Sequence, residues 1–356
     1  MEIRIGNHLI GNEHPTYFIA DIAANHDGSL ERAKLLIRLA KDAGADAAKF
    51  QNFQAAKIVS DYGFKSIGGQ VSHQAKWKKS VFDVYKDASV PFDWTPDLKA
   101  ECDRVGIDYF SSPYDFESID YLDPFVPAYK IGSGDINWPE ELERMARKGK
   151  PVLLATGASD IGDVQRAVRT ILVVNPQLVL MQCNTNYTAS LENFDHLHLR
   201  VLTTYHNMYP DLILGLSDHT PGHASVLGAV ALGARVVEKH FTDDNNREGP
   251  DHAFAMNPKS WADMVENTRQ LERALGSGDK FVAENEKQTF YLQRRCLRAA
   301  RDLKAGEIIT RDMIDVLRPV AAGAILPNEM DAVIGTKVLN DLRSGKEIRW
   351  TDLGQS

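Results

Sequence analysis

The sequence Leu214-Gly-Leu-Ser-Asp-His-Thr-Pro-Gly222, followed by Val236-Val-Glu-Lys-His-Phe-Thr242, decides the fold. Each segment is a short apolar run that ends in a histidine, and the small residues between the segments suit a helix that links two parallel strands. We therefore expect His219 and His240 at the same ends of neighbouring strands. Two imidazoles in that position can share one divalent metal ion, which indicates an active site rather than a structural site.

Six further apolar runs precede these two segments, and helix-like stretches separate them. The runs cover residues 17–23, 47–51, 108–112, 128–133, 152–156 and 178–183. Eight strand–helix units over about 260 residues are typical of a TIM (β/α)8 barrel. A doubly wound open sheet is the alternative, but that fold usually has fewer strands and a glycine-rich first turn, which this sequence lacks.

The segments outside this pattern predict two smaller parts. Residues 1–15 suit a small hairpin that plugs the bottom of a barrel domain comprising residues 1–275. Residues 276–290 begin with Gly-Ser-Gly and continue with a charged stretch, which is typical of a linker. Residues 291–356 predict a small β-rich domain, which is too short to be very stable alone and is therefore expected to dock on a barrel, its own or a partner's.

Composition limits the classes of function. The 356 residues carry a formal net charge of −8, which argues against nucleic acid as a partner because a phosphate backbone requires a basic surface. Cys102, Cys183 and Cys296 form no CxxC pair, which favours a reducing compartment. Since no signal-peptide pattern occurs and no apolar run reaches the roughly 20 residues of a membrane span, we expect a cytoplasmic protein without a membrane partner.

Polar residues gather at the predicted carboxyl ends of the strands, where the chemistry of TIM barrels lies. They are Asp21, Asn25, Lys49, Gln51, Ser111, Ser112, Lys130, Ser133, Asn184, Asn186, Ser217, His219 and His240. Lysines among hydroxyl groups suit a phosphate and a carboxylate, because both anions accept charge-assisted hydrogen bonds. Two other roles remain open for Lys49 and Lys130, namely salt bridges to internal carboxylates and Schiff-base catalysis.

Asp251 lies in a Gly-Pro-Asp turn after the last predicted strand. A loop aspartate can cap a helix or bind a substrate. The loop in question leaves the strand of the second histidine, which favours substrate binding.

Six motifs, in this order, resemble the sialic acid (N-acetylneuraminate) synthase family. They are Ala-Asp-Ile-Ala-Ala-Asn-His-Asp-Gly at 20–28, Lys-Phe-Gln at 49–51, Tyr-Lys-Ile-Gly-Ser-Gly at 129–134, Ser-Asp-His-Thr at 217–220, Glu-Lys-His-Phe-Thr at 238–242 and Gly-Pro-Asp at 249–251. The tail from about Arg294 resembles the small antifreeze-like (SAF) domain of that family. The resemblance implies condensation of phosphoenolpyruvate with N-acetylmannosamine or a diacetamido-trideoxy hexose, giving a nonulosonic acid and phosphate.

The resemblance also implies a role for individual residues. Asp21, His219 and His240 are the implied catalytic residues, and the two histidines are the implied ligands of a divalent metal, with Mn²⁺ expected and Mg²⁺ or Co²⁺ as alternatives. The implied phosphoenolpyruvate-binding residues are Lys49, Ser112, Lys130, Ser133, Asn184 and Ser217, and the implied sugar-binding residues are Gln51, Tyr187, Asp251 and Arg318. Arg318 is implied to reach into the barrel of a second subunit, so the resemblance predicts a domain-swapped homodimer.

Several positions depart from the family pattern. Asp21 stands where the family usually has glutamate, so its carboxylate is displaced by about one C–C bond and proton transfer can become water-mediated or be lost. Ala155 stands where a serine is frequent, and the altered order of residues 183–187 leaves Asn184 or Asn186 to supply an expected amide. These changes favour an altered substrate preference first and lost activity second. A related condensation, a pyruvate lyase and a non-catalytic binding protein remain the alternatives.

Overall fold

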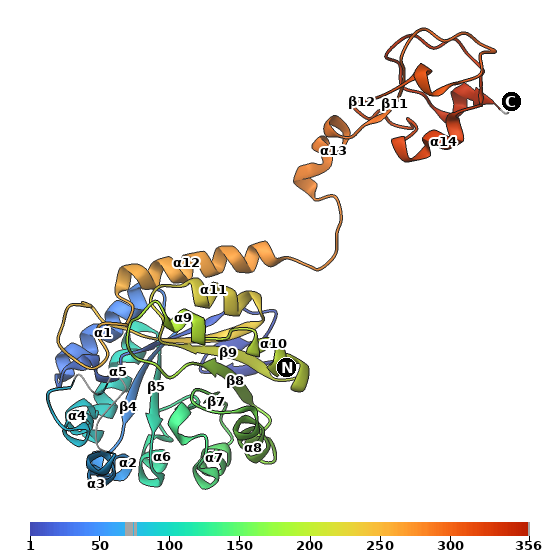
Figure 1. Cartoon of the computed structure of the whole chain (residues 1–356). Coiled ribbons are helices and arrows are strands. Elements are labelled where there is room, and N and C mark those ends of the chain that lie inside the picture. The colour runs from blue at the N-terminus through green and yellow to red at the C-terminus, as the bar shows by residue number, and fades with distance from the viewer. Residues whose placement is uncertain (68–73, 75–76, 355–356) are drawn as a thin grey trace. The chain divides into compact units, whose positions relative to one another are not determined.

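The computed structural model describes residues 1–67, 74 and 77–354, and the chain divides into two compact units, Met1–Gly276 and Ser277–Ser356 (Figure 1). Eight parallel strands form the centre of the first unit. They are β3 (Tyr17–Asp21), β4 (Ala47–Asn52), β5 (Asp108–Pro113), β6 (Tyr129–Ile131), β7 (Val152–Ala155), β8 (Leu178–Cys183), β9 (Ile213–Asp218) and β10 (Ala234–His240). Their order is β5-β4-β3-β10-β9-β8-β7-β6, and β5 lies beside β6, so the sheet curls into a nearly closed barrel. The TIM-barrel prediction is confirmed.

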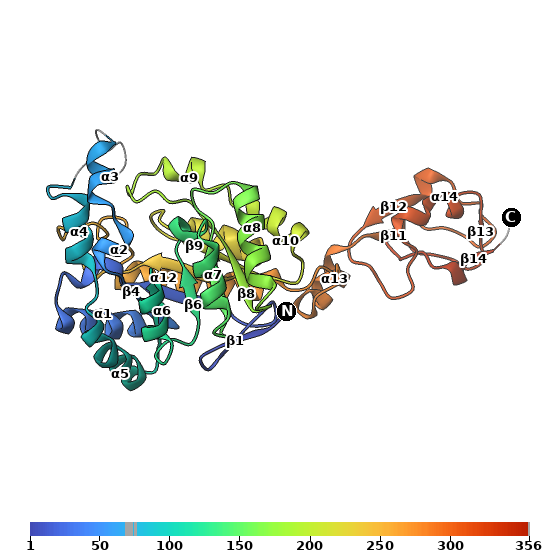
Figure 2. The ribbon, with the colours of Figure 1, turned by 90° about the horizontal axis from the view of Figure 1, so that it is seen from below.

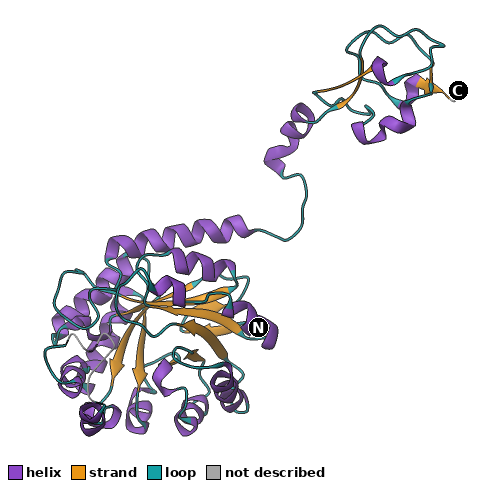
Figure 3. Cartoon of the chain, in the orientation of Figure 1, coloured by secondary structure: helices purple, strands orange, loops and turns teal. Residues whose placement is uncertain are grey.

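Helices cover the outside of this barrel, as the colouring in Figure 3 shows. They are α1 (Leu30–Asp42), α2 (Ala55–Ile58), α3 (Asp61–Ser66), α4 (Val81–Ala88), α5 (Thr95–Val105), α6 (Phe116–Leu122), α7 (Pro139–Ala146), α8 (Ile161–Leu172), α9 (Asn193–His196), α10 (Val201–Met208), α11 (Ala224–Ala231) and α12 (Pro258–Leu275). Helix α1 begins where the Ser29 side chain accepts a hydrogen bond from the Arg32 N–H, and its apolar stripe is buried against the sheet. The helix that links the two histidine strands is α11, which is shorter than residues 222–235 would allow.

The N-terminal hairpin closes the bottom of the barrel. Strands β1 (Ile3–Ile5) and β2 (His8–Ile10) pair antiparallel. Ile3, Ile5 and Ile10 are buried in one cluster with the apolar residues that face the barrel interior. This placement confirms the predicted plug, and it seals the barrel on the side away from the strand carboxyl ends.

Side chains alternate between the two faces along each strand, and this alternation places a layer of polar side chains above the apolar side chains of the barrel interior. Successive strand residues face opposite sides of the sheet, so every second residue faces the barrel interior. On β10, Val236 belongs to the interior apolar cluster, and Glu238 and His240 follow it on the same face. On β4, Ala47 belongs to that cluster and Lys49 follows it. The side chains at the carboxyl ends therefore point into the mouth of the barrel.

The second unit is small and rich in short strands. Strand β11 (Cys296–Ala299) pairs antiparallel with β12 (Ile314–Leu317), and β13 (Lys337–Val338) pairs with β14 (Leu353–Gly354). Helices α13 (Lys287–Gln293) and α14 (Met330–Val333) complete it, and its apolar residues form a separate core. Within the described residues of both units, no helix is long and apolar enough to cross a membrane.

We expect the buried hairpin to contribute measurably to the free energy of unfolding. Ile5 is 0% exposed, so Ile5→Ala leaves a cavity and is expected to lower the free energy of unfolding by about 2–5 kcal/mol in urea titrations. The matched control is Ile161→Ala, because Ile161 is 46% exposed at the start of α8 and its loss should change stability by no more than about 0.5 kcal/mol. Equal stability of the two variants would contradict a structural role for the plug.

Candidate active site

A cavity of about 470 Å³ lies at the carboxyl ends of the strands. Strand ends supply its floor, and the loops after β4, β5, β6, β8 and β10 supply its walls. The structure brings together in this cavity the predicted residues Asp21, Lys49, Gln51, Ser112, Lys130, Ser133, Tyr187, Ser217, His219, His240 and Asp251. These side chains come from segments that are far apart in the sequence, so their convergence follows from the barrel.

Two predicted residues are not part of this group. The Asn184 side-chain amide donates to the His196 carbonyl at 3.2 Å, and Asn184 does not line the cavity, whereas Thr185 does. Arg318 follows β12 directly and belongs to the second unit. Its contact with a sugar therefore stays a prediction.

A network of four buried charges forms the floor of the cavity. Lys49 Nζ lies 2.5 Å from Asp21 Oδ2, and Lys130 Nζ lies 3.3 Å from Glu238 Oε1. The same Glu238 oxygen lies 3.8 Å from Lys49 Nζ and accepts a hydrogen bond from Ser217 Oγ at 3.2 Å. The salt-bridge interpretation of both lysines is thus confirmed. The carboxylates that pair with them also line the cavity, so pairing and substrate binding do not exclude each other.

Glu238 is the residue of this floor to which the sequence argument gave no role. Its spacing could have indicated a role in the site, because Glu238 stands two residues before His240 on the same strand and therefore on the same face. Its second oxygen, Oε2, is buried and has no hydrogen-bond partner within the described part of the chain. A buried acceptor without a partner is costly, which suggests that a proton donor of a bound ligand completes it.

The charge state of Lys49 argues against Schiff-base chemistry. Burial lowers the pKa of Lys49, but the charges of Asp21 and Glu238 outweigh burial and raise it above the ordinary value. A lysine that forms a Schiff base must act as a neutral amine. Lys49 is instead held as an ammonium ion, which suits the binding of an anion.

The two imidazoles face each other across the same cavity. Their ring centroids are 5.3 Å apart, and His219 Nδ1 donates to the Asn184 carbonyl at 2.9 Å. Burial lowers the pKa of His219, but the hydrogen bond and charge of Cys183 and the hydrogen bond to Asn184 outweigh burial and raise it above the ordinary value. Burial, together with the charges of His219 and Lys49, holds the pKa of His240 well below its ordinary value. His240 is therefore neutral, and neutral imidazole is the form that binds metals.

The residues present fit a metal with few protein ligands. His240 Nδ1 is buried without a hydrogen-bond partner in the described structure, so one lone pair is available there. No group of three or more His, Cys, Asp or Glu side chains that could hold a metal occurs among the residues described. A metal held by two imidazoles would keep its other coordination positions for water and substrate, as in catalytic rather than structural sites.

Asp251 bonds a backbone N–H group and also faces the cavity, and its contact with a substrate stays a prediction. Its Oδ2 accepts a hydrogen bond from the Ala24 N–H at 3.2 Å, in the short 3-10 helix Ala23–His26, and the residue also lines the cavity. Burial raises its pKa to about 6. The next residue, His252, is fully buried and contacts Asp27 Oδ1 at 2.9 Å, which ties this loop to the loop after β3.

A second buried ion pair lies on the outer face of the barrel, next to the two histidines. Asp218 and Lys239 precede His219 and His240 and face the outside of the barrel, and their side chains meet at 2.5 Å. Lys239 Nζ also donates to the Thr220 carbonyl at 2.6 Å. The pair links β9 to β10 directly beside both imidazoles, so it fixes the two strand ends relative to each other.

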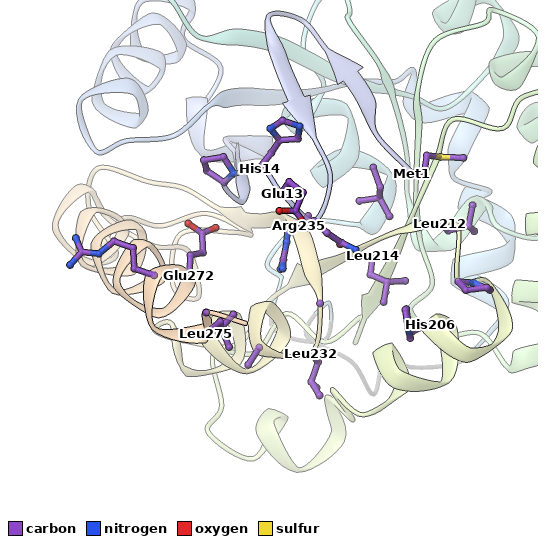
Figure 4. A pocket seen from close by; sticks show the side chains of 18 of the residues that line it. Met1, Glu13, His14, His206, Leu212, Leu214, Leu232, Arg235, Glu272 and Leu275 are labelled. Atoms are coloured by element: carbon purple, nitrogen blue, oxygen red, sulfur yellow. The ribbon is translucent and has the colours of Figure 1, made fainter. Parts of the chain in front are cut away.

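A larger cavity, of about 900 Å³, lies at the opposite end of the barrel, near the first residues of β9 and β10 and the end of α12 (Figure 4). Two of the three arginines that line it, Arg235 and Arg269, have internal partners. Arg235 donates to two backbone carbonyls, and Arg269 donates to the Thr16 carbonyl and to Glu272. We therefore place the chemistry in the smaller cavity, where the strand carboxyl ends converge.

Fold and cavity together define a TIM-barrel protein whose strand ends carry paired lysines, hydroxyls and two imidazoles. The NeuB family matches residues 36–280, and a SAF domain matches residues 294–354. The chain belongs to the NeuB family, which confirms the resemblance given by the six motifs.

Named relatives support this assignment. The chain is 32% identical to human N-acetylneuraminate-9-phosphate synthase, covering 93% of this chain and 90% of that protein. It is also 32% identical to the N,N'-diacetyllegionaminic acid synthase of Legionella pneumophila, covering 96% and 95%. Among solved structures, the N-acetylneuraminic acid (sialic acid) synthetase of Leptospira borgpetersenii, in complex with citrate, has a TM-score of 0.70 and 29% identity, covering 81% of this chain and 95% of that chain.

The buried pair of Asp218 and Lys239 gives a stability prediction. Lys239→Met leaves Asp218 buried without its counter-ion and is expected to lower the free energy of unfolding by about 3–5 kcal/mol. Lys65→Met is the control, because Lys65 and Asp61 form an exposed pair in α3 that is worth about 0.5 kcal/mol or less. Urea unfolding of both variants measures the difference, and a loss below about 1 kcal/mol in Lys239→Met would contradict the role assigned to the pair.

Proposed function

We propose that the protein condenses phosphoenolpyruvate with an N-acylated amino-sugar aldose, giving a nonulosonic acid and inorganic phosphate. The observation that carries this proposal is that two buried lysines and two imidazoles line one strand-end cavity. The lysines and hydroxyls suit a phosphorylated carboxylate, and the imidazoles suit the activation of an aldehyde. The names of the relatives, which are sialic-type acid synthases, support the same reaction.

Phosphoenolpyruvate would lie over the charged floor. Lys49 and Lys130 would hold its phosphate and carboxylate, and the hydroxyls of Ser112, Ser133 and Ser217 would donate further hydrogen bonds. Carbon 3 of the enol forms the new C–C bond with the aldehyde carbon. Water then adds at carbon 2, and the bond from carbon 2 to the phosphate oxygen breaks, so that phosphate leaves and a 2-keto acid remains.

A divalent metal held by His219 and His240, with Mn²⁺ as our first choice and Mg²⁺ or Co²⁺ as alternatives, would polarise the aldehyde oxygen as a Lewis acid. Asp21 would act as the acid or base beside it. Its Oδ2 lies 3.7 Å from His240 Nε2, which keeps the carboxylate on the reacting side of the cavity. Since Asp21 is engaged by Lys49, we propose that it moves protons through a water molecule.

The sugar would lie above this floor. Tyr187 packs against His219, with ring centroids 4.2 Å apart and ring planes tilted by 58°, and Gln51 and Asp251 also line the cavity. We propose that these three side chains contact the sugar. Arg318 of a second subunit would reach its acyl group, which makes the working unit a domain-swapped homodimer.

The role of the imidazoles predicts a strict dependence on metal. His219→Ala and His240→Ala should each lower phosphate release from phosphoenolpyruvate and aldose more than about 100-fold, since each removes a ligand. His206→Ala, at the other end of the barrel, is the control and should keep full activity. Wild-type activity that survives chelation and buffer exchange would refute the Lewis-acid role.

The role of Arg318 predicts a selective loss of sugar affinity. Arg318→Ala removes a charged hydrogen-bond donor, so KM for the aldose should rise at least about tenfold while KM for phosphoenolpyruvate stays unchanged. Arg343→Ala is the control, because Arg343 is another exposed arginine of the same unit. An equal rise in both KM values would mean that Arg318 serves folding or dimerisation instead.

A further inference from the structure

A buried histidine joins two of the loops that surround the active-site cavity. Strands β3 and β10 are neighbours, and the helices that follow them, α1 and α12, pack side by side on the outside of the barrel (Figure 2). His252, in the loop after β10, is fully buried, and its Nε2 lies 2.9 Å from Asp27 Oδ1, in the loop after β3. Its Nδ1 lies 2.7 Å from Thr242 Oγ1, and its carbonyl accepts a hydrogen bond from the Asn245 side chain at 2.9 Å. We call the contact of His252 with Asp27 the loop clasp.

The surroundings hold the loop clasp in one arrangement. A Cβ atom at Gly249 would lie 2.6 Å from Cδ2 of the His252 ring, so only glycine lets the backbone of the turn pass so close to the ring. On the other side, Arg247 donates two hydrogen bonds to Asp27 Oδ2, at 2.8 and 2.6 Å, and Arg32 of α1 lies 3.1 Å from the same oxygen. Burial raises the pKa of Asp27, but the hydrogen bonds from His252 and Arg247 outweigh burial and lower it, so the carboxylate is ionised at neutral pH.

The loop clasp fixes one end of the short 3-10 helix after β3. Asp27 follows this helix directly and has φ +50°, and Ala23 at its start has φ +43°. Both values lie in the left-handed region, which costs free energy for residues other than glycine and persists only where the surroundings enforce it. The Ala23 N–H donates to Asp21 Oδ1 at 3.1 Å, and the Ala24 N–H donates to Asp251 Oδ2 at 3.2 Å. The helix thus orients two carboxylates of the cavity.

These two carboxylates depend on the loop clasp to different degrees. Asp21 Oδ2 also lies 2.5 Å from Lys49 Nζ, so a second strong contact keeps that carboxylate in place. Asp251 precedes His252 in the chain and accepts its hydrogen bond from the helix, so the loop clasp sets both its backbone and its partner. The residues proposed to hold phosphoenolpyruvate lie on or after β4, β5, β6 and β9, whereas the loop clasp joins the loops after β3 and β10.

We propose that His252 is a positioning residue, which fixes Asp251 for the acceptor sugar by joining the loop after β10 to the loop after β3. This inference rests on the proposed function, in which Asp251 contacts the sugar. His252 does not line the cavity, so it acts through its neighbour. A misplacement of about 1 Å in a positioning contact can cost about 100-fold in rate, so a loosened loop clasp should affect the acceptor far more than phosphoenolpyruvate.

Two substitutions at position 252 separate positioning from packing. His252→Gln keeps an N–H group near the position of Nε2, so it can still donate to Asp27. His252→Asn reaches only about as far as Nδ1, so it can keep the contact with Thr242 and loses the one with Asp27. Phosphate release is measured with the whole chain, phosphoenolpyruvate, Mn²⁺ and the more active of N-acetylmannosamine and a 2,4-diacetamido-2,4,6-trideoxy hexose. In His252→Asn, KM for the aldose should rise at least about tenfold and KM for phosphoenolpyruvate less than about twofold, and His252→Gln should restore most of the loss.

His8→Asn is the matched control. His8 Nδ1 contacts Asp108 Oδ2 at 3.1 Å, which is an imidazole–carboxylate contact of the same kind on the N-terminal hairpin at the other end of the barrel. Its substitution should change neither KM value. A merely structural role of His252 would lower the Tm of His252→Asn and leave both KM values of the folded protein unchanged. That result, or an equal rise in both KM values, overturns the inference.

Hydrogen exchange tests the loop clasp without the reaction. In His252→Asn, the backbone amides of residues 23–27 should exchange at least about tenfold faster than in the unsubstituted protein, although the substitution lies in the other loop. Asp27→Ala should have the same effect on the amides of residues 251–253, and His8→Asn should affect neither loop. Unchanged exchange in the opposite loop overturns the inference. If exchange rises as expected but neither aldose leads to phosphate release with the unsubstituted protein, the proposed reaction is wrong and the positioning of Asp251 by His252 stands.

Discussion

Two buried lysines share one oxygen of Glu238, and the rest of the site depends on this arrangement. Transferring each ion from water costs several kcal/mol, whereas two charges about 4 Å apart attract by about 4 kcal/mol at an effective dielectric constant of 20. The two contributions nearly cancel, so the network of Lys49, Lys130, Asp21 and Glu238 does not by itself stabilise the fold. Its persistence at the barrel mouth is better explained by the anion that it can hold.

The stability that the charged floor does not provide must come from the layers around it. Below the floor, the interior apolar cluster and the N-terminal hairpin fill the barrel. Outside it, the larger apolar cluster joins the sheet to the helices. The same alternation that turns Glu238 and His240 inward turns Lys239 outward, where Asp218 neutralises it. One strand thus supplies an imidazole, a floor carboxylate and one member of a structural ion pair.

The sequence was sufficient for the features that depend on local periodicity. Apolar runs locate the strands, and the barrel rule then brings Lys49, Lys130 and the two histidines to one end. Asn184 could not be placed in the same way, because its side chain turns to the His196 carbonyl, a partner that only the folded loop supplies. The aromatic side chains of Phe53, Tyr85 and Tyr114, which line the cavity, were also missed. They stand on segments after β4 and β5 that meet only through tertiary contacts, such as those of Phe53 with the Tyr85 and Tyr114 rings.

In the proposed reaction, the charged floor of the cavity would hold phosphoenolpyruvate, the substrate that every reaction of this type shares. The rest of the cavity would be left to the acceptor. Overall identity cannot decide the acceptor, since the chain is 32% identical to a synthase named for a 9-phosphate product and 32% identical to one named for a diacetylated product.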